Sequence, residues 1–350
     1  MRSRILQRRG ERRPPRSDSS LELAREWQLW IAENLLRGVA PDALIAGLVE
    51  DGVSPRRAES EVRALAASAA ITAGRAAART AQQLELVAAI GREMRALSAD
   101  PRGVERRARP SAEELFEQYF CASTPVLITD LMTGWPALDR WSPAYFKERL
   151  GDATIAVTTG RAADPDYDRN YAAHTESTTM ARFADRVAAT GESNDFYMVS
   201  NNRNLEASAL LPLLDDIDLP TDYLDPERLQ GCVSLWFGPA GTLTPLHHDT
   251  TNVLFCQIVG RKRFRMIAPQ ETSLLPGARD YYASIDDARE GALIKELVIS
   301  PGEALFLPVG WWHEVRSLDV SVSLSFTNFR RPNRFDWYKP GAPRIASSNG

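Results

Sequence analysis

The stretch from Thr244 to Pro269 reads TPLHHDTTNVLFCQIVGRKRFRMIAP and combines chemically active side chains with apolar runs. Successive side chains of a β-strand point to opposite faces, so residues two apart share a face. On a strand, His247 and Asp249 therefore point to one side, while His248 between them points to the other. An imidazole and a carboxylate on one face predict a binding site for a divalent metal ion.

Two protein ligands leave such a metal ion under-coordinated, so a third ligand has to come from elsewhere in the chain. The chain has only four histidines, and His313 lies in PVGWWHEVR, after the apolar run at 304–307 and a Pro/Gly turn. Its neighbour Glu314 is the rival ligand, but in a strand it would face the other way. Two histidines and one carboxylate form the ligand set of non-haem Fe(II) oxygenases, which leaves open positions on the metal.

A second constraint comes from the segment GRKRFRM at 260–266. Alternation along a strand puts the three arginines on one face and places Lys262 beside Phe264 and Met266 on the other. An unpaired buried ammonium costs several kcal/mol or loses its proton, so Lys262 needs an anionic partner. Either Lys262 reaches water at the strand end, or it binds a carboxylate of a small dianionic co-substrate inside the barrel.

The composition describes an ordinary globular protein. Of the 350 residues, 44% are hydrophobic and 25% are charged, and the net charge is −4. This charge argues against a dedicated nucleic-acid coat, and no apolar run approaches the roughly 18 residues of a membrane span. Three separated cysteines predict neither a disulfide framework nor a zinc site. We therefore expect a cytoplasmic protein without membrane contact.

The N-terminal part contains two segments that differ in composition. Residues 1–20 are rich in arginine and predict a disordered tail, with a loose contact to RNA or an acidic partner as the alternative. Residues 21–98 predict an α-helical domain with a break before Pro41 and a long third helix from Pro55 towards Met94. This domain is expected to be a bundle or dimerisation arm, or else a stabilising appendage.

A polar linker is predicted over 99–111, followed by a β-rich domain over 112–335 and a C-terminal tail over 336–350. The predicted strands are 125–129, 154–158, 196–199, 233–237, 253–259, 264–267, 294–299, 304–307 and 320–326, and the predicted helices are 112–120, 145–150 and 180–189. Short strands at regular intervals, separated by Gly/Pro turns, predict an all-β sandwich or barrel.

Residues 244–269, together with PGEALFLPVGWWHEVRSLDVSVSLSFTN at 301–328, resemble the JmjC/cupin-like family of Fe(II)- and 2-oxoglutarate-dependent oxygenases. The nearest branch contains the asparaginyl hydroxylase that inhibits hypoxia-inducible factor. The resemblance covers roughly 112–331 and leaves the N-terminal helical part outside. It implies a mainly β fold, a double-stranded β-helix or jelly roll with flanking helices, preceded by the α-helical domain.

The resemblance also implies the roles of individual residues. The implied iron ligands are His247, Asp249 and His313. The residues implied to bind 2-oxoglutarate are Lys262, Thr244 and Tyr197, with Asn252 and either Thr327 or Asn328 as further candidates. The family's asparagine stands one position further from the ligand pair than Asn252 does. Fe(II), 2-oxoglutarate and O₂ would together supply the oxidation.

The resemblance implies hydroxylation of a side chain in a peptide or protein, with N-methyl-lysine demethylation, RNA-base hydroxylation and a non-oxygenase metal-binding cupin as alternatives. The polar segment 160–179 is interpreted as a substrate-side loop, because its acidic residues would suit a basic residue of the substrate. Trp236, Trp311 and Trp312 are interpreted as core residues. A homodimer formed through the helical region is left open.

Overall fold

A computed structural model describes residues 25–206, 208–278 and 281–335. The tails predicted over 1–20 and 336–350 lie outside the described residues. The chain divides into two compact units, residues 1–91 and residues 92–350. Among the described residues, no helix combines the length and the apolar character that a membrane crossing requires.

The N-terminal part is helical, as predicted, with α1 (Arg25–Leu36), α2 (Pro41–Glu50), α3 (Pro55–Ala66) and α4 (Ala69–Ala96). The long third helix predicted from Pro55 towards Met94 is divided into two helices, because the chain breaks between α3 and α4. Ser68 explains the break, because its hydroxyl accepts a hydrogen bond from the backbone N–H of Ile71 (3.2 Å) and begins a new helix. A small core of buried side chains from α1, α2 and α3 includes Trp27, Ile31 and Leu48.

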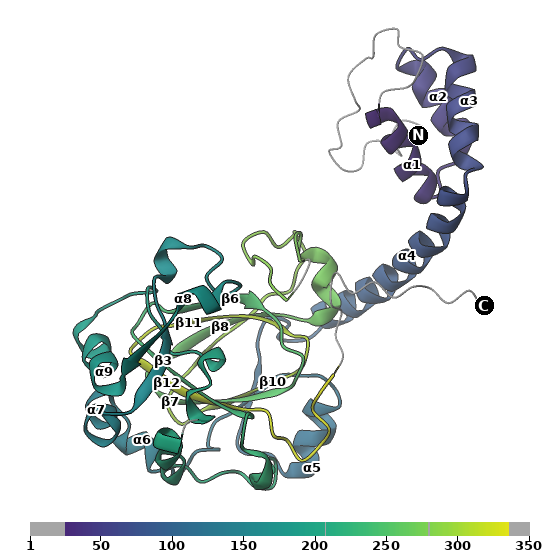
Figure 1. The fold of residues 1–350 in the computed structure, drawn as a ribbon. Helices are drawn as coiled ribbons and strands as arrows, with labels where there is room; N and C mark the ends of the chain where they lie inside the picture. The colour runs from purple at the N-terminus through teal and green to yellow at the C-terminus, as the bar shows by residue number, and fades with distance from the viewer. Residues whose placement is uncertain (1–24, 207, 279–280, 336–350) are drawn as a thin grey trace. The chain divides into compact units, whose positions relative to one another are not determined.

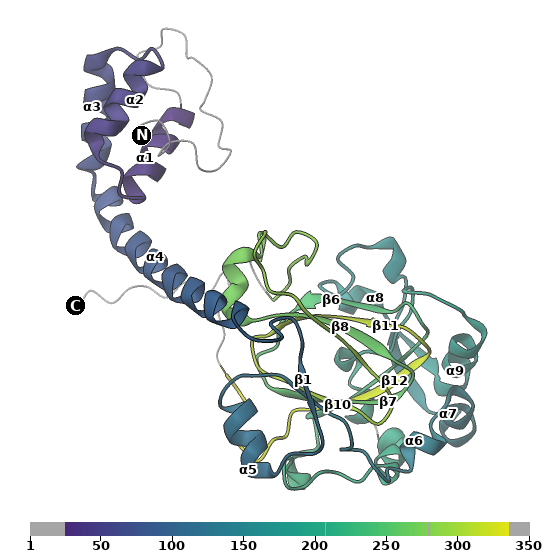
Figure 2. The ribbon, with the colours of Figure 1, turned by 180° about the vertical axis from the view of Figure 1, so that it is seen from behind.

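The larger unit is built on two β-sheets that face each other (Figures 1 and 2). One sheet has the order β1 (Glu105–Arg107), β2 (Val126–Ile128), β10 (Ala304–Leu307), β7 (Val253–Val259), β12 (Ser321–Phe326), β5 (Val233–Gly238). The other has the order β6 (Leu243–His247), β11 (Trp312–Ser317), β8 (Lys262–Ile267), β9 (Lys295–Ile299). These sheets form the predicted jelly-roll core.

Smaller elements flank the two sheets. The strands β3 (Thr154–Thr158) and β4 (Thr175–Thr179) form a separate hairpin, and the helices are α5 (Ala112–Glu114), α6 (Ala137–Arg140), α7 (Pro143–Leu150), α8 (Tyr171–His174) and α9 (Met180–Ala189). A π-helical turn covers Leu115–Phe120, and 3₁₀ segments cover Arg161–Ala163, Ser200–Asn202, Asn204–Glu206, Ser208–Asp216, Pro226–Arg228 and Pro269–Leu274. The helices α7 and α9 pack against each other (Figure 1).

Local alternation predicted most strands correctly, and β3, β7 and β10 have the predicted bounds. The strands β4, β6 and β11 lie outside the runs predicted as strands, and two further segments differ from the prediction. The run predicted as a strand at 196–199 forms only isolated bridges, from Tyr197 to Thr158 and from Met198 to Phe237. The predicted linker contains β1, which pairs in parallel with β2. The polar composition of residues 105–107 did not indicate a strand, because β1 pairs with β2 through backbone groups and not through a pattern of apolar side chains.

A buried carboxylate ties the 3₁₀ segment Ser208–Asp216 to the helices α6 and α7. The Asp216 side chain is 4% exposed and accepts hydrogen bonds from Trp141 Nε1 (3.0 Å), Tyr145 Oη (2.6 Å) and Arg140 Nη1 (2.7 Å). Burial by itself raises the pKa of Asp216, but these hydrogen bonds outweigh it and lower the pKa below its ordinary value. The charged form is therefore the one that stabilises the fold.

We expect Asp216→Ala to lower the free energy of unfolding by about 3 kcal/mol, because it leaves buried donors unpaired. Urea unfolding of both variants would measure this, with Asp215→Ala on the exposed neighbouring residue as the control. Since the folded pKa is lowered, the contribution of Asp216 is present at neutral pH and disappears as the pH falls through that pKa. Equal midpoints for wild type and Asp216→Ala would contradict this account.

Candidate metal and co-substrate site

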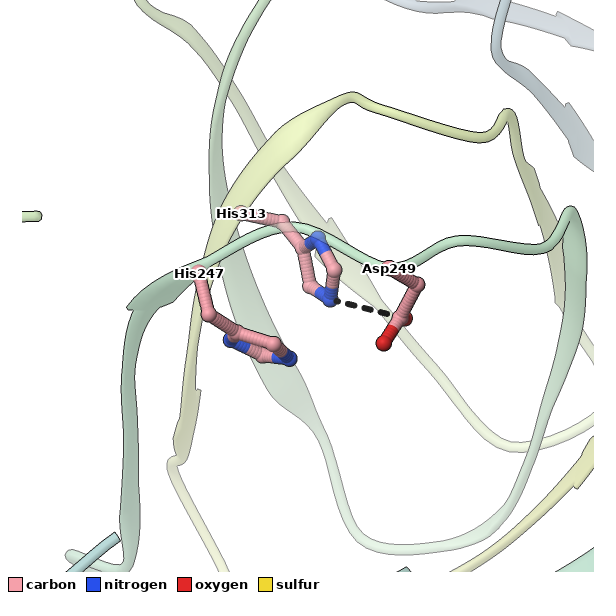
Figure 3. Close-up of side chains that lie close together, drawn as sticks. All are labelled: His247, Asp249 and His313. Atoms are coloured by element: carbon pink, nitrogen blue, oxygen red, sulfur yellow. Dashed lines mark ion pairs between the residues drawn. The ribbon is translucent and has the colours of Figure 1, made fainter. Parts of the chain in front are cut away.

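The three side chains predicted to bind a metal ion converge at one end of the barrel. His247 ends β6, His313 is the second residue of β11, and the two are direct partners in the antiparallel ladder. Their ring centroids lie 4.1 Å apart, and Asp249 Oδ2 lies 3.7 Å from His313 Nε2. One potential ligand atom from each residue falls within 4.8 Å of the others. Figure 3 shows the three side chains pointing toward one common space.

The imidazoles are oriented by backbone carbonyls. His247 Nδ1 lies 2.8 Å from the carbonyl of Pro245, and His313 Nδ1 lies 2.9 Å from that of Trp311. An Nδ1–H donor in each contact fixes the tautomer and leaves Nε2 as a lone-pair donor for a metal. Burial, with the nearby His247 adding to it, lowers the pKa of His313 to about 3. A neutral imidazole is the form that binds a metal, so this donor set fits Fe(II).

Asp249 reaches the site by a different route from the one predicted. β6 ends at His247, so Asp249 lies in the loop beyond the strand, and strand alternation does not explain its direction. Its backbone carbonyl accepts a hydrogen bond from the N–H of Gly310 (3.1 Å), in the loop that precedes β11. Glu314 faces away from the histidines, as predicted, and forms an ion pair with Arg265 (2.6 Å).

A cavity of about 190 Å³ lies beside these ligands, and we call it the inner cavity. Its lining includes all three candidate ligands and Lys262. Lys262 is 1% exposed, and its ammonium donates to Tyr197 Oη (2.7 Å) and lies 5.0 Å from the ring centroid of Phe255. No carboxylate among the described residues forms an ion pair with it. Lys262 therefore does not reach water, and burial lowers its pKa to about 7.

The turn before β8 and a close backbone approach help to place Lys262 and Tyr197. Gly260 has a φ of 69°, and a Cβ at this position would lie 2.1 Å from the carbonyl oxygen of Val320. A Cβ on Gly238 would lie 2.6 Å from the ring of Tyr197. Glycine at both positions therefore permits the tight β7–β8 turn and the packing of Tyr197 against β5.

The remaining predicted co-substrate residues separate into two groups. Thr244 and Thr327 line the inner cavity. Asn252 and Asn328 are not among its lining residues, so the geometry favours Thr327 over its alternative Asn328 and gives no support to a contact of Asn252 with a co-substrate. The Asn252 amide is held instead by Asn333, and its Oδ1 accepts from the N–H of Val309. The Asn328 amide donates to the carbonyl of Asp225 (2.8 Å).

Sequence reasoning missed Arg161, whose guanidinium is buried in the same region. It donates to the carbonyl of Leu243 (2.6 Å) and stacks over Tyr167 at 4.3 Å and Tyr197 at 5.2 Å. Arg161 thus packs against the ring of Tyr197. No local pattern marks this residue, because its partners come from three separate segments.

The predicted substrate-side loop at 160–179 is more regular than expected, since it contains α8 and β4. Within it, His174 forms an ion pair with Asp164 (2.9 Å) rather than facing the metal ligands, whereas Asp168 lies beside them. Trp311 and Trp312 are buried, as predicted. Trp236, predicted as a core residue, is partly buried and lines the inner cavity.

Comparison with known proteins agrees with this geometry. Residues 112–334 match the cupin-like domain family. "Lysine-specific demethylase JMJ30" of Arabidopsis thaliana is 31% identical over 242 residues, which are 64% of this chain and 54% of that protein. "Jumonji C domain-containing protein 5" of Drosophila melanogaster is 32% identical over 243 residues, 62% of this chain and 57% of that protein.

A third relative is matched over most of its length. "Bifunctional peptidase and (3S)-lysyl hydroxylase JMJD7" of Homo sapiens is 22% identical over 255 residues, 62% of this chain and 81% of that protein. The chain spans about half the length of the two relatives above. Since the family match covers residues 112–334 and the two-histidine, one-carboxylate set lies within it, the chain belongs to the cupin-like, JmjC-type family of Fe(II)- and 2-oxoglutarate-dependent oxygenases.

Proposed function

We propose that this protein hydroxylates a C–H bond of an amino-acid side chain in a peptide or protein and converts 2-oxoglutarate to succinate. The observation that carries the proposal is the inner cavity, in which Lys262 has no carboxylate partner among the described residues and shares the space with His247, Asp249 and His313. A buried ammonium and an open metal site together suit a ligand that is a metal chelator at one end and a carboxylate at the other.

The residues that line the inner cavity would have two separate roles. His247, Asp249 and His313 would hold Fe(II), and Lys262 with Tyr197 would bind the distal carboxylate of 2-oxoglutarate. Bound together, iron and 2-oxoglutarate would supply the oxidation of a C–H bond by O₂, in which 2-oxoglutarate loses its C1 carboxylate as CO₂, one oxygen atom enters succinate and the other enters the alcohol. The protein contributes orientation of the co-substrate before O₂ arrives and a cavity lined by hydroxyl-bearing side chains as well as by apolar and aromatic ones.

N-methyl-lysine demethylation is the second candidate, because the relative from Arabidopsis thaliana carries the name lysine-specific demethylase. It requires the same oxidation, directed at an N-methyl carbon. A metal-binding cupin without oxygenase activity is disfavoured, since it would have no need for Lys262 in the cavity. RNA-base hydroxylation is disfavoured by acidic side chains beside the metal site, which would repel a polyanion.

The proposal is tested first without oxygen. Anaerobic addition of Fe(II) and 2-oxoglutarate is expected to give the visible metal-to-ligand charge-transfer band of the chelate. Aerobic incubation with peptide pools, followed by mass spectrometry, is then expected to show the gain of one oxygen atom. Loss of a methyl group with release of formaldehyde would assign demethylation instead. Absence of both the band and succinate would refute an oxygenase.

A further inference from the structure

Arg161 is a buried cation to which the proposed function gives no role. It follows Gly160, whose φ of 67° is left-handed, and only 1% of the residue is exposed. Its backbone N–H donates to the carbonyl of Asp195 (3.2 Å), two residues before Tyr197. Because a guanidinium keeps its proton at any ordinary pH, a full positive charge is buried at this position.

The burial of this guanidinium is costly for the folded state. Its Nη2 donates to the carbonyl of Leu243 (2.6 Å), whereas Nε and Nη1 form no hydrogen bond with any described residue. Asp168 is its ion-pair partner, but at 3.8 Å the two groups are too far apart for a hydrogen bond. Apolar side chains often replace a buried ion pair without loss of stability. The reason for an arginine here is therefore to be sought in the residues that it contacts.

The first contact is with Tyr197. The guanidinium carbon of Arg161 lies 5.2 Å from the centroid of the Tyr197 ring, within the range of an attractive cation–ring interaction. Tyr197 belongs to none of the strands, and its backbone is held by an isolated bridge to Thr158. The direction of its ring therefore depends on side-chain contacts. The hydroxyl on that ring accepts the hydrogen bond from Lys262, so Arg161 helps to place this hydroxyl.

The second contact is with the peptide group that leads into Thr244. The carbonyl of Leu243 accepts from Arg161 Nη2 and also from Tyr167 Oη (2.7 Å). The N–H of Leu243 donates to Asn194 Oδ1 (2.8 Å). Both backbone groups of Leu243 are thus held by side chains, and the backbone from which the Thr244 side chain projects is fixed.

The two contacts converge on one space. Tyr197 and Thr244 come from separate segments of the chain, and both line the inner cavity. Arg161 is not among the residues that line this cavity. It can therefore influence a ligand in the inner cavity through Tyr197 and Thr244, without touching the ligand.

We propose that Arg161 is a positioning residue for 2-oxoglutarate, which holds the hydroxyls of Tyr197 and Thr244 where the distal carboxylate binds. This inference rests on the proposed function and deepens it. Two hydroxyls that are fixed before the co-substrate enters lower the cost of ordering them on binding. Loss of Arg161 should therefore weaken the binding of 2-oxoglutarate, while turnover at saturating co-substrate stays nearly unchanged.

The test is a mutant cycle whose readout is the Kd for 2-oxoglutarate. It is measured without oxygen, by titrating the Fe(II)-loaded protein and following the charge-transfer band. Arg161→Met is expected to raise the Kd by about 10-fold. In the background Tyr197→Phe/Thr244→Val, which lacks both hydroxyls, the same substitution is expected to raise it by less than about threefold, because the groups that Arg161 positions are gone. The kcat for succinate formation should stay within about threefold of wild type.

A milder variant serves if Arg161→Met does not fold. Arg161→Lys keeps a cation near Asp168 but lacks the planar group that stacks on Tyr197 while it donates to Leu243. It is expected to raise the Kd by about threefold to fivefold, and this rise should likewise disappear in the background without the two hydroxyls.

Two control variants separate positioning from the loss of a cation–ring contact or of an ion pair. Arg186 lies 3.9 Å from the ring centroid of Phe196, the neighbour of Tyr197, and neither residue lines the inner cavity. Arg186→Met is therefore expected to leave the Kd unchanged. Asp168→Asn breaks the ion pair of Arg161 but spares its contacts with Tyr197 and Leu243, and is expected to change the Kd by less than about threefold.

The outcomes distinguish this inference from the function on which it rests. An unchanged Kd in Arg161→Met, or an equal rise with and without the two hydroxyls, would overturn the positioning role while the oxygenase assignment stands. A rise in Asp168→Asn as large as that in Arg161→Met would overturn it too, since the ion pair would then be the cause. Failure of the wild-type protein to form the charge-transfer band would instead refute the proposed function.

Discussion

Replacing His313 by alanine is expected to lower succinate formation by at least about 1,000-fold, because the remaining two ligands cannot hold the metal in a catalytic geometry. His313 is buried and pairs with His247 across the β6–β11 ladder, so it contributes one of two nitrogen ligands from a rigid position. Iron content, measured colorimetrically after gel filtration, is expected to fall together with activity.

Glu314→Gln is the matched control, since Glu314 neighbours His313 on β11 but pairs with Arg265 on the opposite face. It is expected to keep its iron and to retain most of its turnover. A His313→Ala protein that kept full iron content and activity would show that the three converging side chains are not the metal site.

Replacing Lys262 by methionine is expected to have two effects of opposite sign. The KM for 2-oxoglutarate should rise by about 100-fold or more, because a carboxylate in this cavity would lose its buried cationic partner. The free energy of unfolding of the protein without co-substrate should rise by about 1–3 kcal/mol, because an apolar side chain replaces a buried ammonium that forms no ion pair with a carboxylate in the described part of the chain. Steady-state kinetics and urea unfolding measure the two effects.

Arg263→Met is the control for this substitution, because Arg263 is the next residue of β8 and points to the other face. Neither the KM nor the iron content should change in that variant by more than about twofold. An unchanged KM in Lys262→Met would remove the reason for assigning 2-oxoglutarate to the inner cavity.

The KM for 2-oxoglutarate should also depend on pH through Lys262. Its pKa is about 7 because the ammonium is buried, so the free protein is charged below this pH and neutral above it. Binding a carboxylate requires the charged form, and above pH 7 the KM should therefore rise by about tenfold per pH unit. Titrations between about pH 6 and pH 9 would show this slope in wild type. Its persistence in Lys262→Met would assign it to another group.

The chemistry of the site could be predicted from the sequence wherever it depended on local periodicity. The alternation in GRKRFRM placed Lys262 on the buried face, and the structure has it there because a strand repeats every two residues. The same rule separated Glu314 from His313. The rule did not apply to Asp249, since β6 ends two residues earlier and a loop contact with Gly310 determines its position.

The sequence by itself determined the β-rich core, the helical N-terminal part and the residue types able to bind a metal and a carboxylate, because neighbouring residues encode these properties. Only the tertiary structure decided which distant residues meet. The β6–β11 register brings His313 to His247, and contacts between separate segments place Arg161 against Tyr197 and hold Asn252 and Asn328 away from the inner cavity. Such pairings depend on strand register and loop packing, which no short stretch of sequence specifies.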